Sequence, residues 1–342
     1  MILSLFATFI ASFIALKLFI TFSNQLGIID IPNERSVHIK AIPSGSGIAI
    51  FLSVFFILVF TYSNEYQHYS LSIIGVLLVF LLGVYDDLRG AVPLYKVIII
   101  AVGTLFLCLD GLMITNLGTY FGYPLIMLSW LSVPFTIIAV VGFTNALNLI
   151  DGLDGLAASI SIVIFSSFWF VGSQNNDQFL LLTSPIIISA LVVFLVFNWN
   201  PAKLFMGDSG SLTLGFVISI MSIKSINYIE PVIILYLLAI PIIDTIVVMI
   251  RRKRSKRPIF FADKQHIHHI FFNIFKEDVK KTVIFITLIQ VSYTAFGLIV
   301  VVNMPYEMAL LLYITSLMGW YILLNRLSQK FISNTEVCEK MV

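Results

Sequence analysis

The sequence predicts an all-α, polytopic integral membrane protein with about 11 transmembrane helices. Of the 342 residues, 59% are hydrophobic and only 11% are charged. The mean hydropathy is +1.01, and roughly a quarter of the residues in a soluble domain are charged. Apolar runs also recur along the whole chain, many of them near the roughly 20 residues that a helix needs to cross a bilayer. These observations exclude an ordinary soluble domain.

Eleven apolar runs are the candidate transmembrane helices. They are Ile2–Ser23, Gly45–Tyr62, Tyr69–Val84, Pro93–Leu109, Pro124–Gly142, Leu156–Gly172, Phe179–Phe197, Ser211–Ser225, Pro231–Ile250, Thr282–Val302 and Pro305–Leu324. The runs that begin at Tyr69, Leu156 and Ser211 are at or below the short end of the spanning range, so we expect them to include polar flanks. We expect one transmembrane catalytic domain, residues 1–325, and a short cytoplasmic tail, residues 326–342.

The basic residues predict the orientation of these helices. If eleven helices alternate direction, one side receives every lysine and arginine except Lys17, which lies within the first run, and Lys224. Cytoplasmic loops carry the excess of basic residues. The N-terminus is therefore expected outside and the C-terminus in the cytoplasm. All the polar motifs described below then lie on the cytoplasmic face, where we expect the active site.

The densest polar motif lies between two long apolar runs. Asn145, Asn148, Asp151 and Asp154 recur every three residues, and this spacing keeps neighbouring members on adjoining parts of one helix face. Polar groups beside hydrocarbon are costly to bury. In a membrane protein, such a cluster indicates a functional site.

Asp86 and Asp87 follow the third apolar run and close the predicted helix. Adjacent carboxylates repel one another unless a cation or a proton intervenes, so the pair predicts divalent-metal binding or a base that acts on a phosphate. A solvated helix end is the alternative. Arg89 and Lys96 follow closely, and basic groups beside acids suit a phosphate–metal site.

Asp208 lies in a Gly-Asp-Ser-Gly-Ser turn just before the eighth run. Such a turn fits a helix N-terminus, where free N–H groups and the helix dipole favour anions. The alternative is that Asp208 or Ser209 only caps the helix. A third acidic motif on the same predicted face favours the functional interpretation.

The largest predicted cytoplasmic loop carries a basic run, residues 251–257, and then His266, His268 and His269. The basic run predicts a topology anchor that meets anionic lipid, while one or two arginines could instead clamp a pyrophosphate. No cysteine or suitably spaced partner accompanies the histidines, which argues against a closed zinc site. We therefore expect the histidines to bind phosphate or sugar rather than to lie on the surface without a function. Asp244 is either a buried helper or a paired structural acid.

Together these motifs resemble the polyprenyl-phosphate N-acetylhexosamine-1-phosphate transferases, glycosyltransferase family 4. The similarity runs from residue 30 to residue 269 in the family's order: Asp-Asp, Asn-x-x-Asn-x-x-Asp-Gly-x-Asp-Gly-Leu, Gly-Asp-Ser-Gly-Ser and His-x-His-His. The His-Ile-His-His motif and the eleven helices are similar to the WecA/TagO branch. One departure is Ser44-Gly45-Ser46-Gly47, where the family often has a Gly-Gly pair.

The resemblance implies a reaction in a bacterial inner (plasma) membrane. An N-acetylhexosamine-1-phosphate, by default GlcNAc-1-phosphate, would pass from a UDP-sugar to undecaprenyl phosphate, releasing UMP and starting a cell-surface polysaccharide. Mg²⁺ is the implied cofactor, with Mn²⁺ as an alternative. The implied partners are undecaprenyl phosphate, a UDP-N-acetyl sugar and membrane lipid, with no nucleic acid. Family members often form dimers in the membrane, so a homodimer stays open.

The resemblance also implies roles for individual residues. Asp208 and Asn148 correspond to Mg²⁺ ligands, and Asp86 and Asp87 are candidates for orienting or deprotonating the lipid phosphate. Lys96 corresponds to a phosphate-binding lysine. The UDP-sugar site would comprise Asp154, which recognises uracil, with Asp151, Asn145, Arg254, His266, His268 and His269.

Four alternatives remain at this point. The enzyme could use a different UDP-N-acetyl sugar, or react through a phosphoryl-aspartate rather than by the direct attack that we favour. A transporter of lipid-linked intermediates would place charges through the bilayer midplane, whereas here the acids are predicted at one face. A catalytically inactive scaffold would be expected to lack at least one of the acids or Asn148, and none is missing.

Overall fold

A computed structural model describes residues 1–30, 32, 41–122, 125–255 and 266–339. Its helices are α1 (Ile2–Leu26), α2 (Gly47–Thr61), α3 (Ser63–Tyr66), η1 (Gln67–Tyr69), α4 (Ser70–Arg89), α5 (Pro93–Leu109), η2 (Ser129–Leu131), α6 (Ser132–Ile150), α7 (Leu156–Asn175), α8 (Gln178–Asn198), α9 (Gly207–Ser225), α10 (Pro231–Leu237), α11 (Ala239–Arg254), α12 (Ile267–Ile274), α13 (Val279–Ile299), η3 (Val301–Asn303) and α14 (Tyr306–Glu339). Two short strands, β1 (Ile29–Asp30) and β2 (Ile42–Pro43), pair antiparallel.

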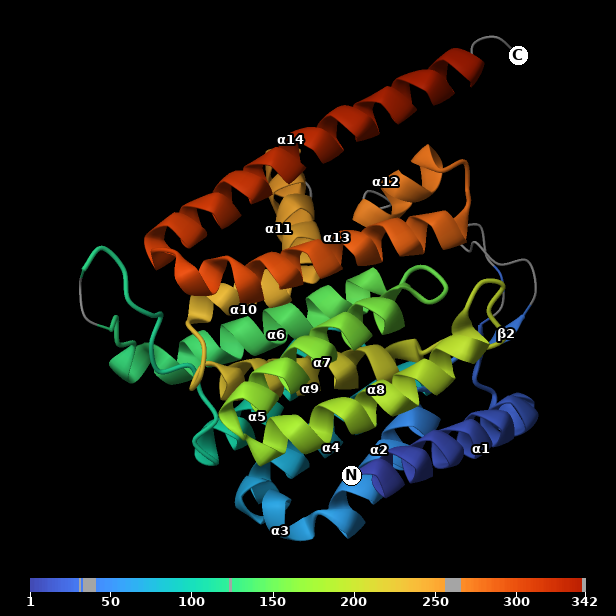
Figure 1. Cartoon of the computed structure of the whole chain (residues 1–342). Helices are drawn as coiled ribbons and strands as arrows, with labels where there is room; N and C mark the ends of the chain where they lie inside the picture. Colours follow the sequence, from blue (N-terminus) through green and yellow to red (C-terminus); the bar gives the residue numbers. More distant parts are fainter. Residues whose placement is uncertain (31, 33–40, 123–124, 256–265, 340–342) are drawn as a thin grey trace.

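Each of the eleven apolar runs contains helix in its described residues, which confirms an all-α, polytopic membrane protein. Seven helices within the described residues are long and apolar enough to cross a membrane, or eight if the bent pair α10–α11 is one span. The helices α2 and α5 are apolar but shorter. The count of eleven and the orientation therefore stay predictions. Figure 1 shows the helices stacked from α1 at one side to α14 at the other.

The central helix α9 is polar for a predicted transmembrane run, and its position in the bundle explains how this is tolerated. All of its residues are buried except Gly207, Asp208, Val217 and Lys224. It packs against α4, α6, α2 and α7, which shield it from lipid. Except for Ser209, its serine and threonine hydroxyls donate to carbonyls one turn earlier, as Thr213 does to Ser209 at 2.6 Å. Buried hydroxyls that are hydrogen-bonded carry little cost.

The helices α10 and α11 meet at an angle of 86°, and α11 stands across the direction of its neighbours in Figure 1. A break exposes backbone groups that must find other partners inside a membrane protein. Gln290 of α13, fully buried, supplies them: its amide donates to the carbonyl of Leu237 at 2.7 Å and accepts from the N–H of Ile240 at 3.0 Å. The bend is therefore a specified feature of the fold.

Backbone bonds join the loop after β2 to the loop before α9. The N–H groups of Ser46 and Gly47 donate to the carbonyls of Phe205 and Met206 at 3.1 and 2.9 Å. The Ser46 hydroxyl also donates to Phe205 at 2.7 Å. The turn that departs from the family's Gly-Gly pair thus anchors the start of α9, although little could be inferred about it from the sequence.

The last helix continues beyond its apolar run. α14 extends to Glu339, and so passes the position 325/326 where we expected a tail to begin. Arg251 near the end of α11 donates to Asn325 of α14 at 3.0 Å. The end of the apolar run is therefore still packed against the rest of the protein.

Candidate active site

Helix ends and turns bring the predicted acids together at one end of the bundle. We call this the acidic end and define it by Asp86, Asp87, Asp151, Asp154 and Asp208. Asp86 and Asp87 end α4, Asp208 begins α9, and the other two lie in the turn between α6 and α7. Motifs separated by more than 120 residues therefore share one site, as the predicted common face requires.

Asp87 holds the start of α9. Its two carboxylate oxygens accept from the backbone N–H groups of Asp208 and Ser209 at 2.7 and 3.0 Å. The first N–H groups of a helix need such acceptors. The side chains of Asp208 and Ser209 do not cap the helix, because the acceptor comes from α4. Asp87 therefore fixes the position of Asp208.

Asp86, Lys96, Asp208 and Asn148 form a charged cluster. The Lys96 ammonium lies 2.6 Å from Asp86 and also donates to Asp208. The Asn148 amide donates to the same Asp208 oxygen at 3.2 Å. Asp86 also accepts from the N–H of Ala91. One lysine bridges two carboxylates that would otherwise repel each other.

We predict that Lys96→Met reduces transfer at least about a hundredfold, because it removes the cation between two carboxylates. A matched control is Lys224→Met. Lys224 is paired with Asp177, and its side chain is 17% exposed against 18% for Lys96, but it lies at the other end of α9. Initial rates of product formation by purified variants would test this. Equal losses in both variants would contradict a specific role for Lys96.

The turn that carries Asp151 and Asp154 is joined to the loop after α8. Asp154 accepts from the Asn200 amide at 2.9 Å and from the N–H of Ala202 at 3.0 Å, both at Oδ2. Asn198 accepts from the N–H of Gly155 at 2.8 Å. These asparagines position the turn, and sequence reasoning missed them because lone asparagines near a helix end carry no specific signal.

The acidic end has an excess of negative charge. Burial raises the pKa of Asp151 well above its ordinary value, and the charges of Asp208, Asp87 and Asp154 raise it further. Like charges in a poorly solvated site favour a proton or a bound cation. A proton on one of these carboxyl groups, or a cation bound among them, would relieve the repulsion.

The histidines belong to the segment that starts α12. His266 is hydrogen-bonded at 2.7 Å to Asp244 of α11, so this buried acid is paired. His268 packs on the turn of the acidic end, since a Cβ added to Gly152 would overlap the His268 ring. His269 lies beside His268, with ring centroids 4.2 Å apart. The predicted histidines and acids are thus neighbours.

We predict that His268 makes the protein less stable below about pH 6.5. Burial and the charges of His269 and His266 lower its pKa well below the usual value. The unfolded chain then binds a proton near pH 6.5 that the folded chain does not, so stability falls as pH falls, by up to about 1.4 kcal/mol per pH unit. Thermal unfolding midpoints at pH 7.5 and 5.5 should differ less in His268→Gln than in the wild type. Identical differences would exclude this effect.

Two predicted UDP-sugar residues bond away from the acids in this structure. The Asn145 amide donates to Val141 of its own helix at 2.7 Å. Arg254 donates to the Tyr321 hydroxyl at 2.9 Å and lies over that ring. Within the basic run, Arg251 and Arg252 are buried. Residues 256 and 257 of that run lie outside the described residues, as do residues 33–40 between the two short strands.

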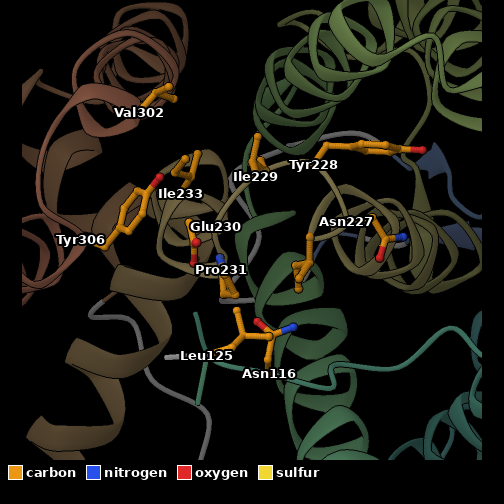
Figure 2. A pocket seen from close by; sticks show the side chains of 11 residues that line it. Asn116, Leu125, Asn227, Tyr228, Ile229, Glu230, Pro231, Ile233, Val302 and Tyr306 are labelled. Atoms are coloured by element: carbon orange, nitrogen blue, oxygen red, sulfur yellow. The ribbon is translucent and has the colours of Figure 1, made fainter. Parts of the chain in front are cut away.

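Figure 2 shows a pocket that is lined by residues of the segment after α9. Its volume is about 290 Å³, and Asn116, Asn227, Glu230 and Tyr306 are among its lining residues. The pocket lies beyond Ser225, where α9 ends, whereas Asp208 lies where α9 begins. A helix of 19 residues is about 28 Å long. This pocket is therefore separate from the acidic end.

The donor atoms of the acidic end fit a magnesium ion. Mg²⁺ prefers oxygen ligands and binds through one or two carboxylates, with water and substrate phosphates completing its shell. The carboxylate of Asp208 offers such oxygen atoms. The side-chain amide of Asn148 offers another if it rotates so that its oxygen, rather than its nitrogen, lies beside Asp208. No three acidic, histidine or cysteine side chains in the described part of the chain form a ready metal site. Asp208 and Asn148 with a substrate phosphate are compatible with that finding.

Comparisons with known proteins identify the family of this chain. The family model described as "Glycosyl transferase family 4" matches residues 68–226. A Bacillus subtilis (strain 168) protein described as a probable undecaprenyl-phosphate N-acetylglucosaminyl 1-phosphate transferase is 35% identical over 249 residues, covering 72% of this chain and 70% of the relative. The chain belongs to glycosyl transferase family 4.

Two further relatives of this family 4 protein are undecaprenyl-phosphate alpha-N-acetylglucosaminyl 1-phosphate transferases. The protein from Yersinia pestis is 31% identical and that from Escherichia coli (strain K12) is 30% identical. The alignments cover 72% and 76% of this chain, and 70% and 74% of the relatives. The region matched by the family model contains all five acids, whereas Asp244 and the histidines lie beyond it.

Proposed function

We propose that this protein transfers an N-acetylhexosamine-1-phosphate, most simply GlcNAc-1-phosphate, from a UDP-sugar to undecaprenyl phosphate. The observation that carries the proposal is the cluster of Asp86, Lys96, Asp208 and Asn148 at one end of a membrane helix bundle. The names of the relatives supply the lipid and the sugar. The product would start a cell-surface polysaccharide.

The reaction is a phosphoryl transfer between two anions. An oxygen of the lipid phosphate attacks the β-phosphorus of the UDP-sugar and forms a new P–O bond. The bond between that phosphorus and the bridging oxygen to the α-phosphate breaks, and its electron pair leaves with UMP. Such a transfer requires positioning and charge neutralisation more than covalent help. Direct attack therefore suffices without a phosphoryl-aspartate.

Lys96 is suited to hold the lipid phosphate. Its ammonium has three N–H donors, and two of them are used by Asp86 and Asp208. The third can donate to a phosphate oxygen. Asp86 then orients the lysine and the incoming phosphate, while Asp87, whose two oxygens already bind backbone N–H groups, maintains the position of Asp208.

The turn of the acidic end and the histidine segment provide the UDP-sugar side of the site. Asp154 has its Oδ2 engaged by Asn200 and Ala202, so its Oδ1 is the atom proposed to recognise uracil. Asp151, His266, His268 and His269 lie near that turn. Asn145 and Arg254 would need new rotamers to reach a ligand, because their present bonds are to Val141 and Tyr321.

Asp208 and Asn148 are the residues proposed to hold Mg²⁺, with Mn²⁺ as an alternative. A bound Mg²⁺ would neutralise charge on the pyrophosphate during transfer. Asp87 binds the backbone N–H of Asp208, and Lys96 donates to the Asp208 carboxylate. These bonds position the oxygen atoms proposed as metal ligands.

The proposed topology has eleven spans, with the acidic end facing the cytoplasm of a bacterium. Adding α2, α5 and α9 to the eight spans counted with the bent pair gives eleven. Helix α5, with 17 residues, is at the short end of the spanning range, α2 has 15 residues, and α9 is shielded by its neighbours. This arrangement leaves nearly all basic residues on the side where the UDP-sugar is available.

Release of UMP by purified protein in detergent tests the function. The assay would contain undecaprenyl phosphate, Mg²⁺ and one of several UDP-sugars, with and without EDTA. Release that requires both the lipid and the metal would support the transferase, and the preferred sugar would identify the donor. No release with any UDP-sugar, from protein shown to be folded, would contradict it.

A further inference from the structure

Asp244 is a fully buried acid on α11 that the family-model match does not include. One of its carboxylate oxygens lies 2.7 Å from Nδ1 of His266, and the other accepts from the backbone N–H of Ile267 at 2.7 Å. Both partners lie more than 20 residues away along the chain. The carboxylate therefore joins α11 to the first turn of α12.

The first of these bonds determines the state of the His266 ring. An ionised carboxylate can only accept hydrogen bonds, so Nδ1 of His266 must carry the hydrogen. Nε2 is then the ring nitrogen that remains for another partner. The second bond satisfies an N–H at the start of α12, a position where a helix has no acceptor of its own.

The consequences extend to the acidic end. The rings of His266 and His268 are nearly parallel, with centroids 5.7 Å apart. His268 packs against Gly152, where no side chain would fit. A displacement of the first turn of α12 would therefore move His268 relative to Asp151 and Asp154 on either side of that glycine.

The direction of α11 is itself specified. Gln290 bonds to two backbone groups at the 86° break between α10 and α11, the carbonyl of Leu237 and the N–H of Ile240. Asp244 follows that break by little more than one helical turn. Gln290 thus sets the direction of α11, and Asp244 couples that direction to the histidines.

We propose that Asp244 is a positioning residue for the UDP-sugar site, acting through His266. This inference rests on the proposed function. Asp244 holds the histidine in its Nδ1–H form and holds the first turn of α12 against the acidic end. The acid touches no substrate itself.

The test is Asp244→Asn in the full-length protein. The asparagine oxygen can still accept from Ile267, but its amide donates to His266, which must move its hydrogen from Nδ1 to Nε2. We expect KM for UDP-GlcNAc to rise roughly tenfold, with KM for undecaprenyl phosphate unchanged. The same substitution made in a His266→Gln background should add little to KM, because the two residues act as one unit. An unchanged KM in the single variant, or an equal rise in both backgrounds, would overturn the proposal.

Asp177→Asn is the matched control. Asp177 is also buried and also accepts from a helix N–H, that of Leu180 at 2.8 Å, and from a side chain, Tyr228 at 2.6 Å. It lies at the end of the bundle opposite the acids, near Lys224. If Asp244 were merely a structural acid, both variants would lose thermal stability and both would keep the wild-type KM.

Hydrogen exchange separates this inference from the proposed function. Asp244→Ala removes both bonds and should speed amide exchange at residues 267–270, and Asp177→Ala should not. This measurement needs no substrate, so it applies even if the wild type releases no UMP. Unchanged exchange in Asp244→Ala would overturn the positioning role, whereas an inactive wild type with faster exchange in the variant would overturn only the function.

Discussion

Asp208→Ala is expected to lower the rate of sugar-phosphate transfer at least about a thousandfold while leaving the protein folded. The substitution removes a proposed metal ligand and one of the two carboxylates around Lys96. Folding should tolerate the change, because Lys96 keeps its bond to Asp86 and Asp87 still binds the backbone N–H groups at the start of α9. Rates of UMP release, measured beside the melting temperature of each variant, check this result.

Asp110→Ala is the control for that experiment. Asp110 is also partly buried and accepts from the N–H and hydroxyl of Ser72 at 2.6 and 2.8 Å, but it follows α5 at the end opposite Lys96. We expect it to keep near-normal turnover. Near-normal turnover of folded Asp208→Ala would remove that residue from the proposed metal site.

Gly47→Ala is expected to destabilise the fold by about 3 kcal/mol or more, at or beyond the upper end for overpacked cores. A Cβ on Gly47 would overlap the backbone N and Cα of Gly210. Backbone cannot rotate aside as a side chain can, so α2 and α9 would have to separate. The loss should appear as a lower melting temperature and a smaller monodisperse fraction in detergent.

Gly142→Ala is the control for Gly47→Ala. Gly142 lies within α6, and a Cβ there would meet nothing within 4 Å. Alanine favours helix over glycine by about 1 kcal/mol, so this variant should be as stable as the wild type or more so. A melting temperature for Gly47→Ala equal to that of the wild type would show that the two helices are less tightly packed than described.

The helix α9 shows where local sequence reasoning stops. Hydropathy predicted a helix at Ser211–Ser225, but this run was at or below the short end of the spanning range. The surrounding helices make its polar residues tolerable, because they exclude lipid and leave the hydroxyls bonded within the helix. Hydropathy is a property of one segment, whereas shielding is a property of its neighbours.

Asp86 and Asp87 show the same limit within the site. The sequence treats them as one motif, and both were predicted to act on the lipid phosphate. Successive residues on a helix face directions about 100° apart, so their partners differ. Asp86 meets Lys96, whereas Asp87 binds the N–H groups of α9, which lie more than 120 residues away.

The sequence by itself determined the class of the protein, its helical runs and the residue types of the site, because apolar length, turn residues and motif spacing are local properties. Only the tertiary structure decided which atoms each acid uses. It pairs Asp244 with His266, bonds Asp87 to the backbone at the start of α9 and packs His268 against Gly152. The physical reason is that a carboxylate's role depends on the donors around it, and these come from segments that only folding brings together.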